Sequence, residues 1–138
     1  MTPENLAALH ARAMQFPGPW SADDFARFLE TPGVFLVAEA AGFALGRVIL
    51  DEAELLTLAV DPDHQRRGVG CRLLAGFEAK AQNQGATRAF LEVATTNLAA
   101  KSLYAAASWR VDGLRKGYYR AKPQPIDAAM MSKAIPNA

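Results

Sequence analysis

The residues whose types and spacing could do chemistry are concentrated in one short loop, Gln65-Arg66-Arg67-Gly68-Val69-Gly70. An apolar run that ends at Val60 precedes this loop, and a helical pattern begins near Val69. Helix N-termini leave backbone N–H groups unpaired and carry partial positive charge, so they bind phosphates. The two glycines let the backbone approach a ligand closely, and the two arginines add positive charge. The loop is therefore predicted to bind an anion.

The alternative for this loop is structural: a tight strand-to-helix connection with solvated arginines. Two known phosphate loops are excluded. A Walker A loop needs a Gly-Lys-Ser/Thr ending, which is missing here. A Rossmann fingerprint needs a third glycine, and Leu73 occupies that position. By itself, the loop indicates an anion site without identifying the anion.

The single cysteine, Cys71, directly follows the loop. Paired with His10 or His64 it could form a thiol hydrolase, since helix N-termini lower thiol pKa values. No flanking sequence matches a cysteine-protease signature, so we expect Cys71 simply to begin the helix. One cysteine also excludes an intramolecular disulfide, which fits a reducing cytosol.

The composition is that of an ordinary globular protein. With 138 residues, of which 51% are hydrophobic and 21% charged, the chain fits a single domain over residues 1–138. A net charge of +1 gives no global sign of a nucleic-acid partner. No apolar run approaches the roughly 20 residues that span a bilayer, and the start of the chain lacks a signal-peptide core. We expect a cytoplasmic protein without a membrane partner.

The elements that must position the loop form a mixed α/β (α+β) arrangement. Helices are expected at residues 3–15, 21–31, 69–85 and from Asn97 onward, and strands at 34–39, 43–50, 55–60, 87–93 and twice between 109 and 135. Ser21 and Asn97 have the positions of N-caps. The run from Leu55 to Val60 is nearly continuous in apolar residues, which is typical of a strand covered on both faces. The order predicts a sheet packed between helices.

The segment Leu58–Gly70 resembles motif A of the GNAT acetyltransferase superfamily. That motif is a strand followed by Gln/Arg-x-x-Gly-x-Gly/Ala and a helix, matched here by Gln65, Gly68 and Gly70. The resemblance continues along almost the whole chain. It implies a central mixed, mostly antiparallel twisted sheet with helices on both faces, and a splayed cofactor slot between the strands that end near Val60 and Val93.

The same resemblance implies acetyl-coenzyme A as cosubstrate and no metal. The strand at 58–60 would offer main-chain groups to the acetyl-pantetheine arm, and the loop would hold the pyrophosphate. The implied cofactor-binding residues are Leu58, Ala59, Val60, Gln65, Arg66, Arg67, Gly68, Val69, Gly70, Cys71, Asn97 and Tyr104. A bulge commonly splays that strand from the next in this family, and bulges are frequent beside active sites.

Acetyl transfer to an amine needs a neutral nitrogen, whereas an α-amino group with a pKa of about 7.7–8.0 is mostly protonated at pH 7. A general base must therefore remove a proton. The resemblance implies Glu92 as this base and Tyr104 as the acid that protonates the departing thiolate. From the residues alone, Glu92 could be an outward-facing strand glutamate and Tyr104 a core aromatic, while Asn97 could serve only as an N-cap.

Three segments resemble the RimI branch of the superfamily, the ribosomal-protein alanine N-acetyltransferases. They are Phe16–Trp20, Leu91–Asn97 and Gly113–Tyr119. The branch implies an acceptor that is the N-terminal alanine of a small-subunit ribosomal protein. Tyr118 and Tyr119 are expected to order that peptide, and Trp20 is either a wall of the acceptor groove or a core anchor.

The basic residues around these tyrosines leave three options open. Arg115, Lys116, Arg120 and Lys122 could form a nucleic-acid patch, a solvated hairpin or a lip for the acceptor peptide. Direct nucleic-acid binding is not expected, because a solvated hairpin is the default.

One departure concerns the end of the helix after Asn97. The family continues into a glycine there, whereas this chain reads Ala107-Ser108-Trp109, so the exit of the helix is expected to differ. The remaining alternatives are a related transferase for another protein amine or a small-molecule amine, and a non-catalytic acyl-CoA-binding module.

Overall fold

The computed structural model describes residues 1–14, 18–120 and 123–136. Its helices are α1 (Pro3–Ala13), α2 (Ala22–Glu30), α3 (Val69–Asn83) and α4 (Leu98–Ala106), with a 3-10 turn η1 (Pro62–His64). Its strands are β1 (Val34–Glu39), β2 (Gly42–Ile49), β3 (Glu52–Val60), β4 (Arg88–Ala94), β5 (Arg110–Tyr119) and β6 (Ile126–Ala134). The predicted order of elements is confirmed, and only the short turn after β3 is added.

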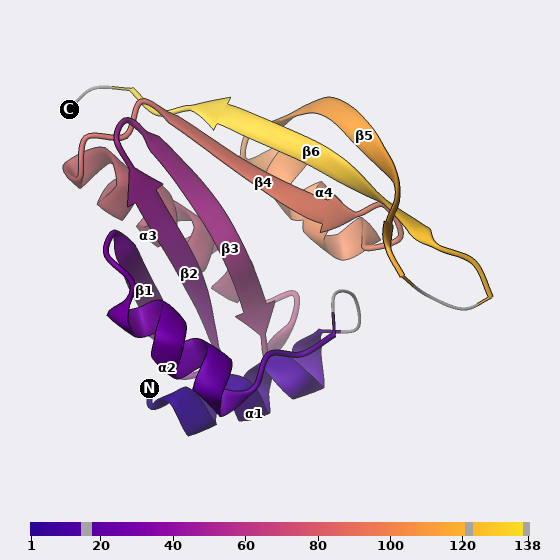
Figure 1. Cartoon of the computed structure of the whole chain (residues 1–138), viewed down its shortest axis with the longest axis horizontal. Coiled ribbons are helices and arrows are strands. Elements are labelled where there is room, and N and C mark those ends of the chain that lie inside the picture. Colours follow the sequence, from indigo (N-terminus) through magenta and orange to yellow (C-terminus); the bar gives the residue numbers. More distant parts are fainter. Residues whose placement is uncertain (15–17, 121–122, 137–138) are drawn as a thin grey trace.

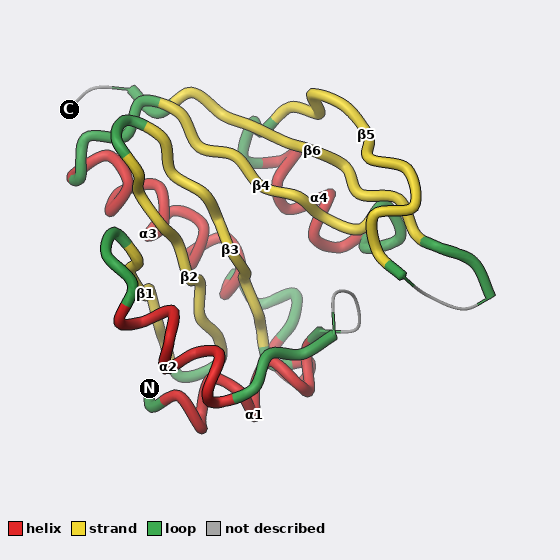
Figure 2. Tube along the Cα trace, in the orientation of Figure 1, coloured by secondary structure: helices red, strands yellow, loops and turns green. Residues whose placement is uncertain are grey.

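The six strands form one sheet in the order β1-β2-β3-β4-β6-β5 (Figure 1). Every neighbouring pair is antiparallel except β3 and β4, which are parallel. Helices α1 and α2 cover one face, here called the front face, and α3 and α4 cover the other, the back face (Figure 2). The predicted mixed, mostly antiparallel sheet with helices on both faces is therefore confirmed.

The parallel pair β3–β4 is held together at one end only. Its register covers Glu52–Glu54 opposite Arg88–Phe90, and beyond these residues the two strands diverge (Figure 1). The splay expected between the strands ending near Val60 and Val93 is present.

A bulge in β3 changes which side chains face the two helical layers. Leu45 of β2 lies opposite Thr57, whereas the next residue, Gly46, lies opposite Leu55, so β3 carries one extra residue. Because side chains alternate along a strand, the extra residue reverses the alternation. Leu55 packs in the core of the back face, whereas Ala59 packs in the core of the front face.

Both layers bury apolar side chains against the sheet. The back core includes Leu73, Leu74 and Phe77 of α3, and the front core includes Leu6, Phe25 and Phe43, which are completely buried or nearly so. The strand at 55–60 is thus covered on both faces, as its apolar run predicted. Within the described ranges, none of the helices combines the length and hydrophobicity that a membrane crossing needs.

The helix ends follow from local sequence. Ser21 and Asp24 form a complete capping box at the start of α2, and the Asn97 side chain accepts a hydrogen bond from the Ala100 backbone N–H at 3.1 Å. Helix α1 ends at Ala13, so the prediction of a helix to residue 15 extended too far, and Gln15, Phe16 and Pro17 lie outside the described residues.

The exit of α4 corrects the expectation drawn from its missing glycine. Ser108 adopts a left-handed φ of 73°, the Trp109 N–H donates to the Tyr104 carbonyl, and the Ser108 N–H donates to the Ala105 carbonyl. These are the two hydrogen bonds of a Schellman motif. The usual stop is therefore retained, with serine in the position that normally favours glycine.

Candidate active site

The loop between β3 and α3 begins with a rigid turn at Asp61. The Asp61 carboxylate accepts a hydrogen bond from the Asp63 N–H at 3.0 Å, and two Arg12 guanidinium nitrogens donate to its two oxygens at 2.9 Å. Hydrogen bonding from Asp63, with help from Arg12, holds the pKa of Asp61 below its ordinary value. The chain therefore leaves β3 in a fixed direction.

The loop then reaches α3 through two left-handed residues. Arg66 has a φ of 64° and Gly68 a φ of 80°, and Gly68 is the N-cap of α3. Glycine has no side chain with which to cap the helix, so the first-turn N–H groups are left to a ligand. A non-glycine residue in the left-handed region is strained, and such strain is common where a loop is shaped for binding. This geometry suits the predicted anion.

A cavity of about 550 Å³ lies between the splayed end of β3, this loop and α4. Most of the predicted cofactor residues line it: Leu58, Ala59, Val60, Gln65, Arg66, Gly68, Val69, Gly70, Cys71, Asn97 and Tyr104. Arg67 is the exception. It is exposed and outside the lining, and its backbone carbonyl accepts a hydrogen bond from Arg72 at 3.4 Å.

The cavity is also lined by residues that were not expected to bind the cofactor: Ala13, Met14, His64, Ala99, Ala100, Ser102 and Leu103. Helical spacing could have identified part of this set, because Ala100, Leu103 and Tyr104 share one face of α4. No periodic signal could have identified Ala13 and Met14, which arrive from the far end of α1.

Gly70 permits the close approach of α3 to α4. A Cβ atom at this position would lie 3.1 Å from Leu103 Cδ2 and 3.8 Å from Val60 Cγ2. A larger side chain would project into the cavity that the loop encloses. The cradle of left-handed backbone, bare helix N-terminus and missing Cβ therefore fits a diphosphate with an extended arm.

Tyr104 lies at the floor of this cavity and is 6% exposed. Its ring contacts that of Trp109 at a centroid distance of 6.0 Å. Burial raises the pKa of the Tyr104 phenol, so the hydroxyl stays protonated at neutral pH. The residue thus combines core packing with a place in the cavity lining.

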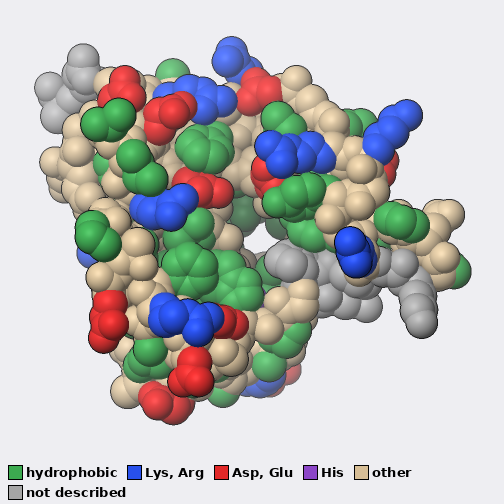
Figure 3. All heavy atoms as spheres, viewed as in Figure 1, with side chains coloured by type: hydrophobic (Ala, Val, Ile, Leu, Met, Phe, Trp, Pro, Cys, Tyr) green, Lys and Arg blue, Asp and Glu red, His purple; other side chains and the backbone are tan. Residues whose placement is uncertain are grey.

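Glu92 lies on the front face, and the structure places it outside the cavity. Its Oε1 is 3.5 Å from Arg115 Nε, and its carboxylate raises the pKa of Tyr118, first through hydrogen bonding and then through its charge. Glu54 of β3 is part of the same cluster, and burial followed by the charge of Glu92 raises its pKa against the opposing effect of Arg47. Figure 3 shows acidic and basic side chains mixed on this face around a hollow.

Tyr119 interacts electrostatically both with Glu92, on the front face, and with Tyr104, in the cavity lining. Burial and the charge of Glu92 raise its pKa to about 12, and Tyr119 in turn contributes to the raised pKa of Tyr104. The rings of Tyr118 and Tyr119 meet edge to face at 5.0 Å. Glu92 and Tyr104 therefore approach the splay from opposite faces, with Tyr119 within electrostatic reach of both.

Trp20 packs as an anchor of the front core. Its ring stacks on Phe28 at 4.7 Å and lies 5.3 Å from Phe25, while part of it stays accessible. This packing favours the core-anchor interpretation of Trp20 over the groove wall.

The remaining alternatives gain little support. Cys71 is exposed, and among the described residues no hydrogen bond joins it to His10 or His64. The charge of Arg115 is offset by Glu92, so one of the four cations that could have formed a nucleic-acid patch is paired. Lys122 lies outside the described residues.

The part of the chain that the structure describes also contains no group of three or more metal-ligating side chains.

Residues 5–108 match the family model described as the acetyltransferase (GNAT) family. The [ribosomal protein bS18]-alanine N-acetyltransferase of Escherichia coli (strain K12) is 34% identical over 134 residues, covering 94% of this chain and 90% of that protein. The N-alpha-acetyltransferase RimI of Mycobacterium tuberculosis is 36% identical over 126 residues, covering 85% and 78%.

Two solved structures of acetyltransferases are also similar to this chain. The crystal structure of the ribosomal-protein-S18-alanine N-acetyltransferase from Escherichia coli superposes with a TM-score of 0.83 at 32% identity, over 96% of this chain and 86% of that one. Arabidopsis thaliana NAA60 in complex with acetyl-CoA superposes with a TM-score of 0.82 over 96% and 93% of the two chains. At 18% identity the second similarity concerns the fold alone.

Proposed function

This chain belongs to the acetyltransferase (GNAT) family, and from that premise we propose that it transfers an acetyl group from acetyl-CoA to the N-terminal alanine of a small-subunit ribosomal protein. Family membership makes it an acetyl-CoA-dependent N-acetyltransferase. The proposed acceptor is the one named for the Escherichia coli relative, which matches nearly the whole chain.

The observation that carries the proposal is the cavity at the splay of β3 and β4. Its backbone cradle at Gly68 and Gly70 suits the coenzyme A diphosphate, and the diverging end of β3 leaves main-chain groups that β4 does not pair. Acetyl-CoA supplies the acetyl group as a thioester whose thiolate is the leaving group. The Arg66 side chain adds a positive charge at the cavity.

Each face of the splay is assigned one reactant, the acceptor amine or acetyl-CoA. We assign the acceptor to the front face, where Glu92 takes a proton from the α-ammonium group, directly or through water. Tyr104, on the cavity side, gives its phenolic proton to the departing sulfur. The α-ammonium group thus loses one proton to Glu92, and the neutral amine forms the C–N bond to the acetyl carbon as the C–S bond breaks. The nitrogen loses its second proton to water as the amide forms, the thiolate gains a proton from Tyr104, and proton exchange with water restores both side chains. Tyr118 and Tyr119 border the acceptor's approach to Glu92.

The test uses acetyl-CoA with a peptide that copies the alanine N-terminus of ribosomal protein bS18, and follows release of free thiol. Turnover on this peptide, absent when its N-terminus is blocked, would support the proposal. Glu92→Gln should lower kcat by roughly 10²–10⁴-fold and leave acetyl-CoA affinity unchanged. Glu54→Gln is the matched control, since it removes a carboxylate from the same cluster without touching the proposed base.

The other outcomes separate the rivals. Turnover on a lysine side chain or a small amine, but not on the alanine peptide, would move the assignment to another acceptor class. Acetyl-CoA binding without turnover on any amine would favour a non-catalytic module and overturn the proposed reaction.

A further inference from the structure

Strand β5, at the edge of the sheet in Figure 1, carries Tyr118 on an irregular segment. The segment Arg115–Tyr119, here called the tyrosine bulge, pairs at its two ends with Ala128 and Ile126 of β6. Five residues of β5 therefore lie opposite three of β6, and the extra residues bend the strand out of its regular pairing. Tyr118 belongs to the part of β5 that leaves the ladder.

The middle of the tyrosine bulge is fixed by one short hydrogen bond. Gly117 has a left-handed φ of 61°, which suits a residue without a Cβ, and its N–H donates to Asp127 Oδ1 at 2.8 Å. A bond between a backbone N–H and a carboxylate is charge-assisted and stronger than one between neutral groups. The backbone carbonyl of Asp127 in turn accepts the Thr95 N–H at 2.9 Å, directly after β4 ends. The bulge is thus held, through Asp127, to the end of the strand that carries Glu92.

Tyr118 contacts the proposed base. Hydrogen bonding to Glu92 is the largest cause of the raised pKa of Tyr118, and the charge of Glu92 is the next. The guanidinium of Arg115 lies 5.4 Å from the centre of the Tyr118 ring, so the ring is placed between the two charged groups. A carboxylate that accepts a hydrogen bond is favoured in its ionised form. The phenol therefore orients Glu92 and favours the form that can take up a proton.

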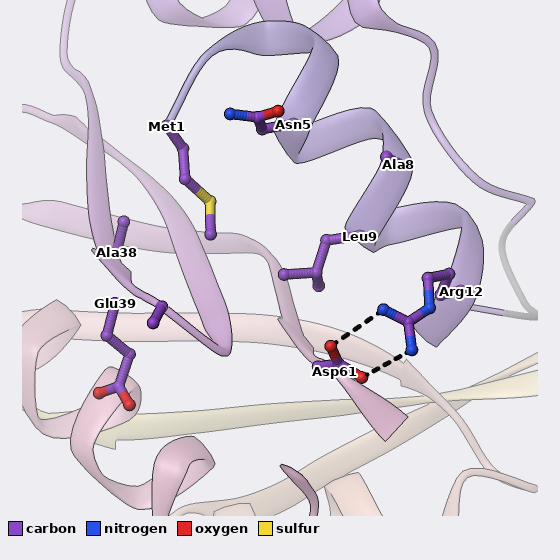
Figure 4. A pocket seen from close by; sticks show the side chains of 9 residues that line it. Met1, Asn5, Ala8, Leu9, Arg12, Ala38, Glu39 and Asp61 are labelled. Atoms are coloured by element: carbon purple, nitrogen blue, oxygen red, sulfur yellow. Dashed lines mark hydrogen bonds and ion pairs between the residues drawn. The ribbon is translucent and has the colours of Figure 1, made fainter. Parts of the chain in front are cut away.

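Arg115, at the start of the bulge, holds it less firmly than Asp127 does. Figure 4 shows the geometry of a firm pair, in which two nitrogens of Arg12 donate to the two oxygens of Asp61, each at 2.9 Å. Arg115 approaches Glu92 only to 3.5 Å, and its side chain is 53% exposed. Long, exposed ion pairs contribute little. The short bond from Gly117 to Asp127 is therefore the contact that fixes the bulge.

The other charged or titratable groups around Glu92 belong to β2, β3 and β5. They are Arg47 and Glu54, which pair at 3.4 Å, together with Arg115 and Tyr119. Removing the Asp127 carboxylate also removes a negative charge, which by itself favours the ionised form of a neighbouring carboxylate. Release of Tyr118 from Glu92 acts in the opposite direction. The sign of the effect therefore separates a change of charge from a change of position.

We propose that Asp127 is a positioning residue for acetyl transfer, which fixes the tyrosine bulge so that Tyr118 donates its hydrogen bond to Glu92. The inference rests on the proposed function, because it takes Glu92 as the base that accepts a proton from the acceptor. Asp127 acts on the base through Gly117 and Tyr118.

Three variants and one control separate these contributions. Asp127→Ala removes the acceptor of the Gly117 N–H, whereas Asp127→Asn keeps a carbonyl oxygen there and removes only the charge. Tyr118→Phe keeps the ring and removes the hydroxyl. Asp24→Ala is the control for stability, because the Asp24 carboxylate also accepts a backbone N–H, that of Ser21 at 3.0 Å, in the capping box of α2.

The first measurement does not depend on turnover. Carbon-13 labelling of the three tyrosines lets NMR follow each phenol as the pH rises. Asp127→Ala should lower the pKa of Tyr118 toward the ordinary value of 10.0, as Glu92→Gln should, because the carboxylate that raises it is then distant or absent. Asp127→Asn and Asp24→Ala should leave it unchanged. An unchanged pKa of Tyr118 in a folded Asp127→Ala protein would overturn the inference.

The second measurement is kcat/KM for the bS18 N-terminal peptide between about pH 6 and 9. Asp127→Ala should lower kcat/KM roughly 3–10-fold and move the acidic limb of its pH profile to higher pH. Asp127→Asn should keep kcat/KM within about twofold of the unaltered protein. Asp127→Ala should add little to Tyr118→Phe, because both remove the same bond to Glu92. The acetyl-CoA Kd should not change, since neither residue lines the cavity.

The remaining outcomes are distinct. Full additivity of Asp127→Ala and Tyr118→Phe, or an equal loss of kcat/KM in Asp24→Ala at the same melting temperature, would make Asp127 a purely structural residue and overturn the inference. Absence of turnover by the unaltered protein, with the pKa of Tyr118 responding to Asp127→Ala as described, would instead count against the proposed function.

Discussion

The two sides of the splay are built in different ways. The cavity that opens toward the back face is formed largely by residues nearly contiguous in sequence, from Leu58 to Cys71, with α4 and the end of α1 completing its lining. On the front face, the cluster of Glu54, Glu92, Arg115 and Tyr118 brings charged and phenolic side chains together from β3, β4 and β5. The back site depends on the shape of the backbone, whereas the front site depends on the charges of side chains.

This difference predicts that the two sites respond differently to amino-acid substitutions. A site made of backbone N–H groups tolerates most side-chain changes and fails when a new side chain fills the cradle. A site made of charged side chains fails when one charge is removed, even if the shape is preserved. The family motif covers the first kind of site, so it indicates the class of ligand but carries no information on the acceptor.

The largest effect should come from filling the cradle. Gly70→Glu places a side chain where even a Cβ lies 3.1 Å from Leu103, and it adds negative charge beside the expected diphosphate. We expect acetyl-CoA affinity to fall by more than roughly 100-fold, about 3 kcal/mol. Calorimetry measures this, and circular dichroism checks the fold. Gly113→Glu is the control, because it adds the same single charge at a glycine outside the cavity lining where a Cβ meets nothing within 4 Å. Normal affinity in a folded Gly70→Glu protein would contradict the cofactor site.

A decrease in pH should destabilise the fold through His10, whose ring is completely buried and accepts or donates a hydrogen bond at each nitrogen. Burial lowers its folded pKa to about 4, below the ordinary histidine value of 6.5, so the unfolded chain binds a proton more readily. Stability is therefore complete above about pH 6.5 and is lost as the pH falls toward 4, by up to about 3 kcal/mol. Urea unfolding between pH 4 and 7 measures the slope. His10→Gln should flatten it by about one proton, and an unchanged slope would show that His10 does not titrate in this way.

A smaller effect is expected from the phenol on the cavity side. Tyr104→Phe keeps the buried ring and removes the proton assigned to the thiolate, so kcat should fall roughly 10–100-fold while acetyl-CoA and peptide affinities stay the same. Pre-steady-state thiol release separates this step from product release. An unchanged kcat would mean that Tyr104 serves only as a core partner of Trp109.

The same contrast explains how much could be predicted from sequence. The family resemblance named twelve cofactor residues, and all of them except Arg67 line the cavity. Periodicity and capping residues predicted most element boundaries, because these depend on residues close together in the chain. The position of Glu92 outside the cavity and its pairing with Arg115 depend on which strands become neighbours. The bond of His10 to Thr57 joins residues 47 positions apart, and no local pattern signals it.

The smallest effect is expected from Ser108→Gly, which tests whether the cavity depends on the backbone conformation at the end of α4. Ser108 holds the left-handed position that ends α4, with a φ of 73°, and the next residue's N–H, that of Trp109, donates to the Tyr104 carbonyl. Ser108→Gly relieves the left-handed penalty of roughly 1–2 kcal/mol but adds the backbone entropy of glycine, so we expect a net stabilisation of about 0.5–1 kcal/mol. The urea midpoint should rise while kcat and both affinities stay unchanged. A loss of activity would mean that the strain at Ser108 contributes to the site itself, and that the back side depends on side-chain detail as the front side does.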